Sequence, residues 1–96
     1  MEVITDVLEA HQALDKDRWT RARADADALL VRHEYRLRQD AGEARPQDDM
    51  AIKLGTVQPG ISRSVKRGDE VLRDSARLRD AHAVATAADI DPELLS

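Results

Sequence analysis

The basic side chains in the middle of the chain are separated from its acidic residues. From Lys53 to Gly68 the sequence contains four basic residues and no aspartate or glutamate, although the whole chain has a net charge of −4. An acidic protein still binds a polyanion when its positive charge is concentrated on one surface. The four residues that supply this charge are Lys53, Arg63, Lys66 and Arg67. This segment is therefore the first candidate for a binding surface, and its partner would carry phosphate groups.

Other residue types that carry chemistry do not form a recognisable arrangement. The chain has no cysteine, which excludes disulfides, a thiolate nucleophile and a cysteine-based zinc site. His11, His33 and His82 fall on three different predicted helices, and we interpret them as partly buried, hydrogen-bonded side chains. We find no glycine-rich phosphate loop and no Ser-His-Asp arrangement, and Asp48-Asp49 is more typical of a helix start than of an acid/base pair. We therefore expect no enzyme activity, no cofactor and no metal.

The elements that position the basic segment are predicted to be helices. Apolar residues recur at three- and four-residue steps over 2–14, 18–41 and 70–88, and over two shorter stretches on either side of Gly55. The stripe of the long helix 18–41 consists of Trp19, Ala22, Ala26, Leu29, Leu30, His33 and Leu37. Sustained period-two alternation is absent, so we predict an all-α fold with a single domain over 1–96.

Several residues mark where these helices start and end. Asp15 and Asp17 either cap a new helix or lie within one helix that runs through this point. Gly42 is predicted to end a helix, and Pro46 suits a connector or a first turn. Gly68 followed by Asp69 predicts another helix end and helix start. Asp91-Pro92-Glu93 predicts a final short turn that carries Leu94 and Leu95.

The apolar content of the chain is low for a monomer. Leucine, isoleucine and valine make up 21 of 96 residues, and phenylalanine is absent. Such a chain has a thin core, and oligomerisation is a natural remedy. We see no signal peptide after Met1 and no window of about 18 apolar residues, so we expect a cytoplasmic protein with no membrane partner.

The segment 50–68 is more specific than its periodicity. It reads Met-Ala-Ile-Lys-Leu-Gly-Thr-Val-Gln-Pro-Gly-Ile-Ser-Arg-Ser-Val-Lys-Arg-Gly. An alanine, a leucine-glycine pair, a glutamine-proline pair and an isoleucine-serine-arginine run occur in this order. This segment resembles the helix-turn-helix unit of bacterial and phage DNA-binding regulators. The resemblance covers about residues 29–68, with the unit itself at about 47–68.

The resemblance implies a role for each residue type. Ala51 is small because the second helix crosses closely over it, while Met50, Leu54 and Ile61 fill the wedge between the helices. Gly55 permits a positive φ at the turn. Gln58 and Pro59 open the second helix, which is the recognition helix. The residues expected to face base edges are Gln58, Ser62 and Arg63, and those expected to bind phosphates are Lys53, Lys66 and Arg67.

The sequence departs from the family pattern at four positions. Val57 stands where a serine or threonine usually caps the recognition helix, so either Thr56 takes over this role or the cap is missing. Thr56 itself replaces an aliphatic residue, and Ser64 replaces a frequent apolar one. Gly60 weakens the recognition helix by roughly 0.5–1 kcal/mol relative to alanine.

Two functions from different classes follow as hypotheses. The first is a small transcriptional regulator that binds double-stranded DNA as a homodimer, with 18–41 and 70–88 as the dimerisation scaffold, either alone or together with 2–14. The second is a helical protein-interaction module without nucleic-acid binding, such as a phage structural component, an inhibitor or an antitoxin-like partner. Salt dependence separates them, because contacts between basic residues and phosphates release counterions.

Overall fold

The described part of the chain is entirely helical. The computed structural model describes residues 16–95, so the helix predicted over 2–14, together with His11, lies outside the described residues. The described residues form no strand, and the prediction of a small all-α domain is confirmed. The elements are α2 (Lys16–Asp40), α3 (Pro46–Leu54), α4 (Gln58–Leu72), α5 (Ser75–Ala87) and the 3-10 helix η1 (Pro92–Leu95). None of the described helices is long and apolar enough to cross a membrane.

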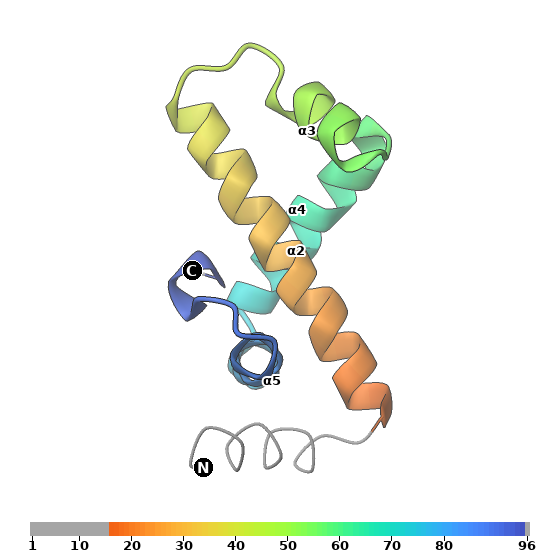
Figure 1. Cartoon of the computed structure of the whole chain (residues 1–96), viewed down its shortest axis with the longest axis vertical. Coiled ribbons are helices and arrows are strands. Elements are labelled where there is room, and N and C mark those ends of the chain that lie inside the picture. The colour runs from red at the N-terminus through yellow and green to blue at the C-terminus, as the bar shows by residue number, and fades with distance from the viewer. Residues whose placement is uncertain (1–15, 96) are drawn as a thin grey trace.

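The long helix α2 is the element around which the others are arranged. Helix α4 crosses α2 near the middle of both, as Figure 1 shows. Helix α3 packs on α4 at the C-terminal end of α2, whereas α5 and η1 pack on α2 on the other side of the crossing. The molecule is elongated, with principal extents of 45 × 25 × 24 Å.

Gly68 lies where α4 crosses α2. A Cβ atom at this position would lie 3.1 Å from the carbonyl oxygen of Ala28 and 3.1 Å from the Cβ of Arg32. The prediction that Gly68 ends a helix is therefore wrong, because α4 continues to Leu72. The glycine is needed for the close approach of two helices and not for a chain reversal.

The helix predicted over 70–88 is correspondingly shorter. It begins at Ser75, after the side chain of Asp74 accepts hydrogen bonds from the amides of Ala76 and Arg77. These bonds satisfy two of the amides that have no partner in the first turn of a helix. Val71 and Leu72, predicted on the stripe of this helix, belong to α4 instead.

Three apolar clusters hold the helices together. The largest joins α2, α4, α5 and η1 through Ala26, Leu29, Val71, Ala81, Ala85 and Leu95. The second contains Ala22 and Val84, with Trp19 packed against them. The third lies between α3 and α4 and contains Met50, Ala51 and Ile61. Leu37, predicted on the apolar stripe of α2, is 57% exposed.

Other predicted helix ends are confirmed. Gly42 follows α2 with a φ of +80°, and its amide donates to the carbonyl of Gln39. Pro46 is the first residue of α3, and Asp48 and Asp49 lie in its first turn. Asp91 accepts a hydrogen bond from the amide of Glu93 at the start of η1.

Candidate nucleic-acid interface

The connection between α3 and α4 is a three-residue turn that begins at Gly55. Gly55 has a φ of +65°, and the amides of Gly55 and Thr56 donate to the last carbonyls of α3. A Cβ on Gly55 would meet no atom within 4 Å. The glycine is therefore required by the left-handed backbone conformation and not by lack of space.

The small cluster beneath this turn fixes the angle between α3 and α4. Met50, Ala51 and Ile61 are 0%, 5% and 2% exposed, as the sequence predicts for the residues that fill the wedge. The prediction for Leu54 is wrong, because this side chain is 48% exposed. The half-buried residues that close the cluster instead are Val31, Tyr35 and Val65.

Helix α4 begins without a side-chain cap. Its N-cap residue, Val57, has extended backbone angles and makes no side-chain hydrogen bond to the helix. Thr56 does not replace it, so of the two alternatives the missing cap is the correct one. The hydroxyl of Thr56 lies over the first turn, 3.0 Å from where a Cβ on Gly60 would be. Gly60 therefore makes room for Thr56 at the start of α4.

The outer face of α4 presents basic and polar side chains to solvent. Gln58, Pro59, Arg63 and Lys66 are exposed, and Ser62 is half-buried. Arg63 and Lys66 are three residues apart and so lie on one face of the helix. Within residues 16–95 neither side chain forms a hydrogen bond or an ion pair. Both cations are therefore available to an external anion.

A side-chain network at the start of α4 includes a residue that sequence reasoning missed. The Oε1 atom of Gln47 accepts hydrogen bonds from Nε2 of Gln58 and, at 3.0 Å, from the hydroxyl of Ser62. The Nε2 atom of Gln47 lies 3.5 Å from the hydroxyl of Tyr35. Gln47 thus orients two of the three residues expected to read bases. Gln47 lies in the first turn of α3, and its contacts to α4 leave no signal in the local sequence.

An open hollow of about 270 Å³ lies beside this network. Its lining comes from the C-terminal part of α2, the residues that lead into α3, the first turn of α3 and the first residue of α4, including Tyr35, Arg45, Gln47, Asp48 and Gln58. The hollow therefore lies beside the start of α4 and carries hydroxyl, guanidinium, amide and carboxylate groups.

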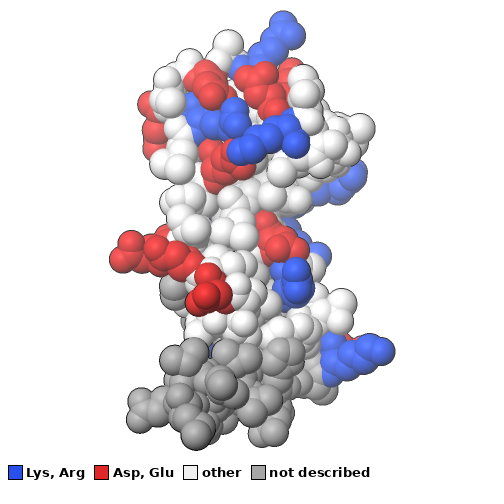
Figure 2. Space-filling view, in the orientation of Figure 1, with Lys and Arg blue, Asp and Glu red and all other residues white. Residues whose placement is uncertain are grey.

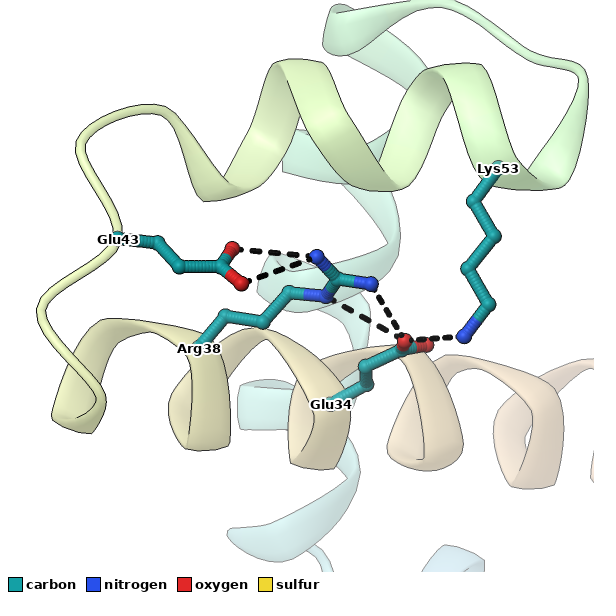
Figure 3. A network of polar contacts seen from close by, with 4 residues as sticks. All are labelled: Glu34, Arg38, Glu43 and Lys53. Atoms are coloured by element: carbon teal, nitrogen blue, oxygen red, sulfur yellow. Dashed lines mark hydrogen bonds and ion pairs between the residues drawn. The ribbon is translucent and has the colours of Figure 1, made fainter.

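Lys53 is held by an ion-pair network on α2. Its ammonium nitrogen lies 2.7 Å from Oε1 of Glu34, which also accepts hydrogen bonds from Arg38 (Figure 3). Arg38 in turn binds both carboxylate oxygens of Glu43. The hydrogen bond from Lys53 holds the pKa of Glu34 below its ordinary value, against the opposing effect of burial and with a further contribution from Arg38. Lys53 is thus directed toward α2.

Figure 2 shows the surface of the same end of the molecule. Lysine and arginine side chains are intermixed there with aspartate and glutamate side chains. Such a mixed surface gives no single sign of potential over the width of a nucleic acid. The acid-free segment, which includes the first eleven residues of α4, is the better candidate surface.

Arg67 is paired with a buried carboxylate. Its Nε atom lies 2.8 Å from Oδ1 of Asp25, which also binds Arg77 and is 1% exposed. Burial raises the pKa of Asp25, but the hydrogen bonds from Arg77 and Arg67 lower it by more, so that its net pKa lies below the ordinary value of 3.8. The carboxylate is therefore charged at neutral pH.

The remaining candidate residues do not form a second site. His33 and His82 are both half-buried, on α2 and α5. In the part of the chain that the structure describes, no group of three or more His, Cys, Asp or Glu side chains could hold a metal ion. No protein-family model, curated protein or solved structure matches this chain.

Proposed function

We propose that the protein binds double-stranded DNA in a sequence-specific manner, through the N-terminal half of α4, as a small transcriptional regulator. The observation that carries this proposal is the outer face of α4. It follows a three-residue turn at Gly55 and exposes Arg63 and Lys66, which have no partner among residues 16–95. No acidic residue interrupts the helix before Asp69. The order of residue types in 50–68, which resembles a helix-turn-helix unit, supports the same proposal.

The geometry suits a helix that enters the major groove. That groove admits an α-helix, and the residues near the N-terminus of a recognition helix contact base edges. Arg63 is the residue with the reach and the donors for guanine, and Gln58 and Ser62 are oriented beside it by Gln47. Lys66 lies one turn beyond Ser62 and binds a phosphate. Lys53 joins this set only if its bond to Glu34 is broken.

A homodimer is part of this proposal. Half of the twelve buried hydrophobic residues in the described part of the chain are alanines, so each side chain contributes little burial. A dimer would add apolar contacts and present two recognition helices about 34 Å apart, one turn of B-DNA. The expected target is therefore an inverted repeat.

The test is a substitution on the exposed face of α4 with a matched control on α5. After a preferred site has been selected from random duplexes, Arg63→Ala is expected to weaken binding to that site by about 1–3 kcal/mol. Arg79→Ala removes an equally exposed arginine from α5 and is expected to leave the affinity unchanged. Equal affinity of the Arg63→Ala variant and wild type in a gel-shift titration would remove Arg63 from the interface.

A second candidate function has one observation in its favour. Ile52, Leu54 and Val57, on α3 and the turn that follows it, are 81%, 48% and 60% exposed. Exposed aliphatic side chains are a common component of protein-binding surfaces. A protein-interaction module without nucleic-acid binding would show no retention on heparin or random duplex DNA at low salt, whereas the proposed regulator is retained and released as salt rises.

A further inference from the structure

The carboxylate of Asp25 lies where three helices meet. Asp25 belongs to α2, Arg67 to α4 and Arg77 to α5. The two arginines, which donate hydrogen bonds to Asp25, are 42 and 52 residues away from it in the sequence. Asp25 is 1% exposed, whereas the side chains of Arg67 and Arg77 are 40% and 26% exposed. A buried charge of this kind is stable only when it is paired and hydrogen-bonded.

The two arginines use their nitrogen atoms differently. Arg77 binds Asp25 in a bidentate manner, with Nε 3.1 Å from Oδ2 and Nη2 2.8 Å from Oδ1. Arg67 donates only through Nε. Within residues 16–95 neither Nη group of Arg67 donates a hydrogen bond. The side chain of Arg67 is 40% exposed, and its Nη groups are the donors that the contact with Asp25 does not use.

The two arginines do not share Asp25 equally. Two guanidinium groups bind one buried carboxylate. The bidentate pair between Arg77 and Asp25 is the stronger geometry. The pKa of Arg77 is raised above its ordinary value, first by the hydrogen bonds to Asp25 and further by the charges of Asp74 and Glu70. Arg67, one turn beyond Arg63 on α4, therefore makes the weaker, single contact to Asp25 and keeps its Nη donors.

We propose that Asp25 is a positioning residue that holds Arg67 by its Nε atom, so that the Nη groups of Arg67 bind a backbone phosphate of DNA. This proposal rests on the proposed function of α4. A guanidinium fits the two roles, because its planar group offers Nε to one anion and Nη to another. An arginine that is already fixed loses less conformational entropy when it binds a phosphate. The ion pair with Asp25 thus orients Arg67 for the phosphate contact and leaves its Nη groups available.

The experiment measures the salt dependence of binding to one duplex for wild type, Arg67→Gln, Arg67→Lys and the control Arg79→Gln. Loss of one phosphate contact makes the slope of log K against log salt less steep by about 0.9, which is roughly a tenfold loss at 0.1 M salt. Arg67→Gln is expected to show this loss. Arg67→Lys is expected to show the same loss although it keeps the charge, because its single ammonium group pairs with Asp25. Arg79→Gln should match wild type.

The variants of Arg67 leave Arg77 on Asp25, so the buried carboxylate keeps a partner and the fold is expected to persist, which circular dichroism checks. A wild-type slope for Arg67→Gln would overturn the phosphate contact. A wild-type slope for Arg67→Lys would overturn the positioning role, because charge alone would then be sufficient. If wild type binds no duplex at any salt concentration, the proposed function fails, and this proposal fails with it. The two failures are therefore distinguishable.

Discussion

The polar groups at the two ends of the molecule differ in how they are hydrogen-bonded. Around α5 the helix start is capped by Asp74, and the buried Asp25 is bound by two arginines. Around the turn at Gly55, neither α3 nor α4 begins with a side-chain cap hydrogen bond, and Arg63 and Lys66 lie exposed without partners in the described chain. Arg63 and Lys66 are therefore available to a partner at the end where we propose the binding surface.

The apolar clusters at the two ends also differ, in size and in burial. Near α5 the largest cluster buries Val71, Ala85 and Leu95 completely. Near the turn the cluster of Met50, Ala51 and Ile61 is smaller, and Ile52 beside it is 81% exposed. One end therefore supplies most of the stability of the fold, and the other is held by few side chains.

The largest effect is expected from removing the buried carboxylate. Asp25→Ala leaves two arginines facing each other without their partner, and the loss of a buried ion pair costs about 3–5 kcal/mol of unfolding free energy. Urea denaturation followed by circular dichroism measures this loss. Asp27→Ala, on the exposed side of the same helix, is the control and is expected to change stability by less than about 0.5 kcal/mol. Similar stabilities of the two variants would mean that Asp25 does not stabilise the three-helix junction.

The next effect concerns the cluster under the turn. Met50→Ala is expected to cost about 2–4 kcal/mol, because Met50 is fully buried and little can fill the space it leaves. Ile52→Ala, two residues away on the same helix, is expected to cost less than about 0.5 kcal/mol. Thermal unfolding of both variants gives the comparison. If Ile52→Ala were the more damaging, the side chain of Ile52 would have a partner in the folded protein.

Helix caps sharpen the contrast at a smaller scale. Asp74→Ala is expected to lower the free energy of unfolding by about 1 kcal/mol, because two amides of α5 lose their acceptor.

Val57→Ser is expected to raise the free energy of unfolding by about 0.5–1 kcal/mol, because Val57 already has the extended backbone of a capping residue. Denaturation midpoints test both changes. A destabilised Val57→Ser protein would contradict the description of α4 as uncapped.

The smallest effect is expected from the surface network of Lys53. Glu34→Gln is expected to cost about 0.5 kcal/mol at neutral pH, because exposed ion pairs contribute little. The pKa of Glu34 is lowered in the folded state, so its contribution is present above the ordinary value of 4.5 and is lost as the pH falls through the lower folded value. The difference between variant and wild type should therefore vanish in acid and shrink at high salt. A difference that persists at pH 2 would exclude the charge as its cause.

Local signals were sufficient to predict much of the fold. The periodicity of α2, the left-handed glycine after α3 and the proline that opens it depend on neighbours along the chain, and these predictions are confirmed. Gly68 shows the limit of such reasoning. A glycine before an aspartate is typical of a helix end, but here its reason is the carbonyl of Ala28, 40 residues earlier in the sequence.

The candidate site was less predictable for the same reason. Arg63 and Lys66 are exposed, as the sequence of α4 predicts. No other residue of the described chain binds them. Lys53 and Arg67 are basic residues of the same acid-free segment, yet Glu34 and Asp25 on α2 bind them. Long-range ion pairs of this kind leave no local signal. The role of Gln47 likewise appears only when α3 and α4 are placed side by side.

Helix α4 runs without a break between two apolar clusters, with Ile61 in one and Val71 in the other. At 1.5 Å per residue its 15 residues span about 22 Å. A rigid rod of this length that tilts by about 5° about its Val71 end moves its Gln58 end by about 2 Å. Repacking of α5 against the Val71 end of α4 would therefore change the orientation of the helix face proposed to read DNA, although α5 makes no contact with that face.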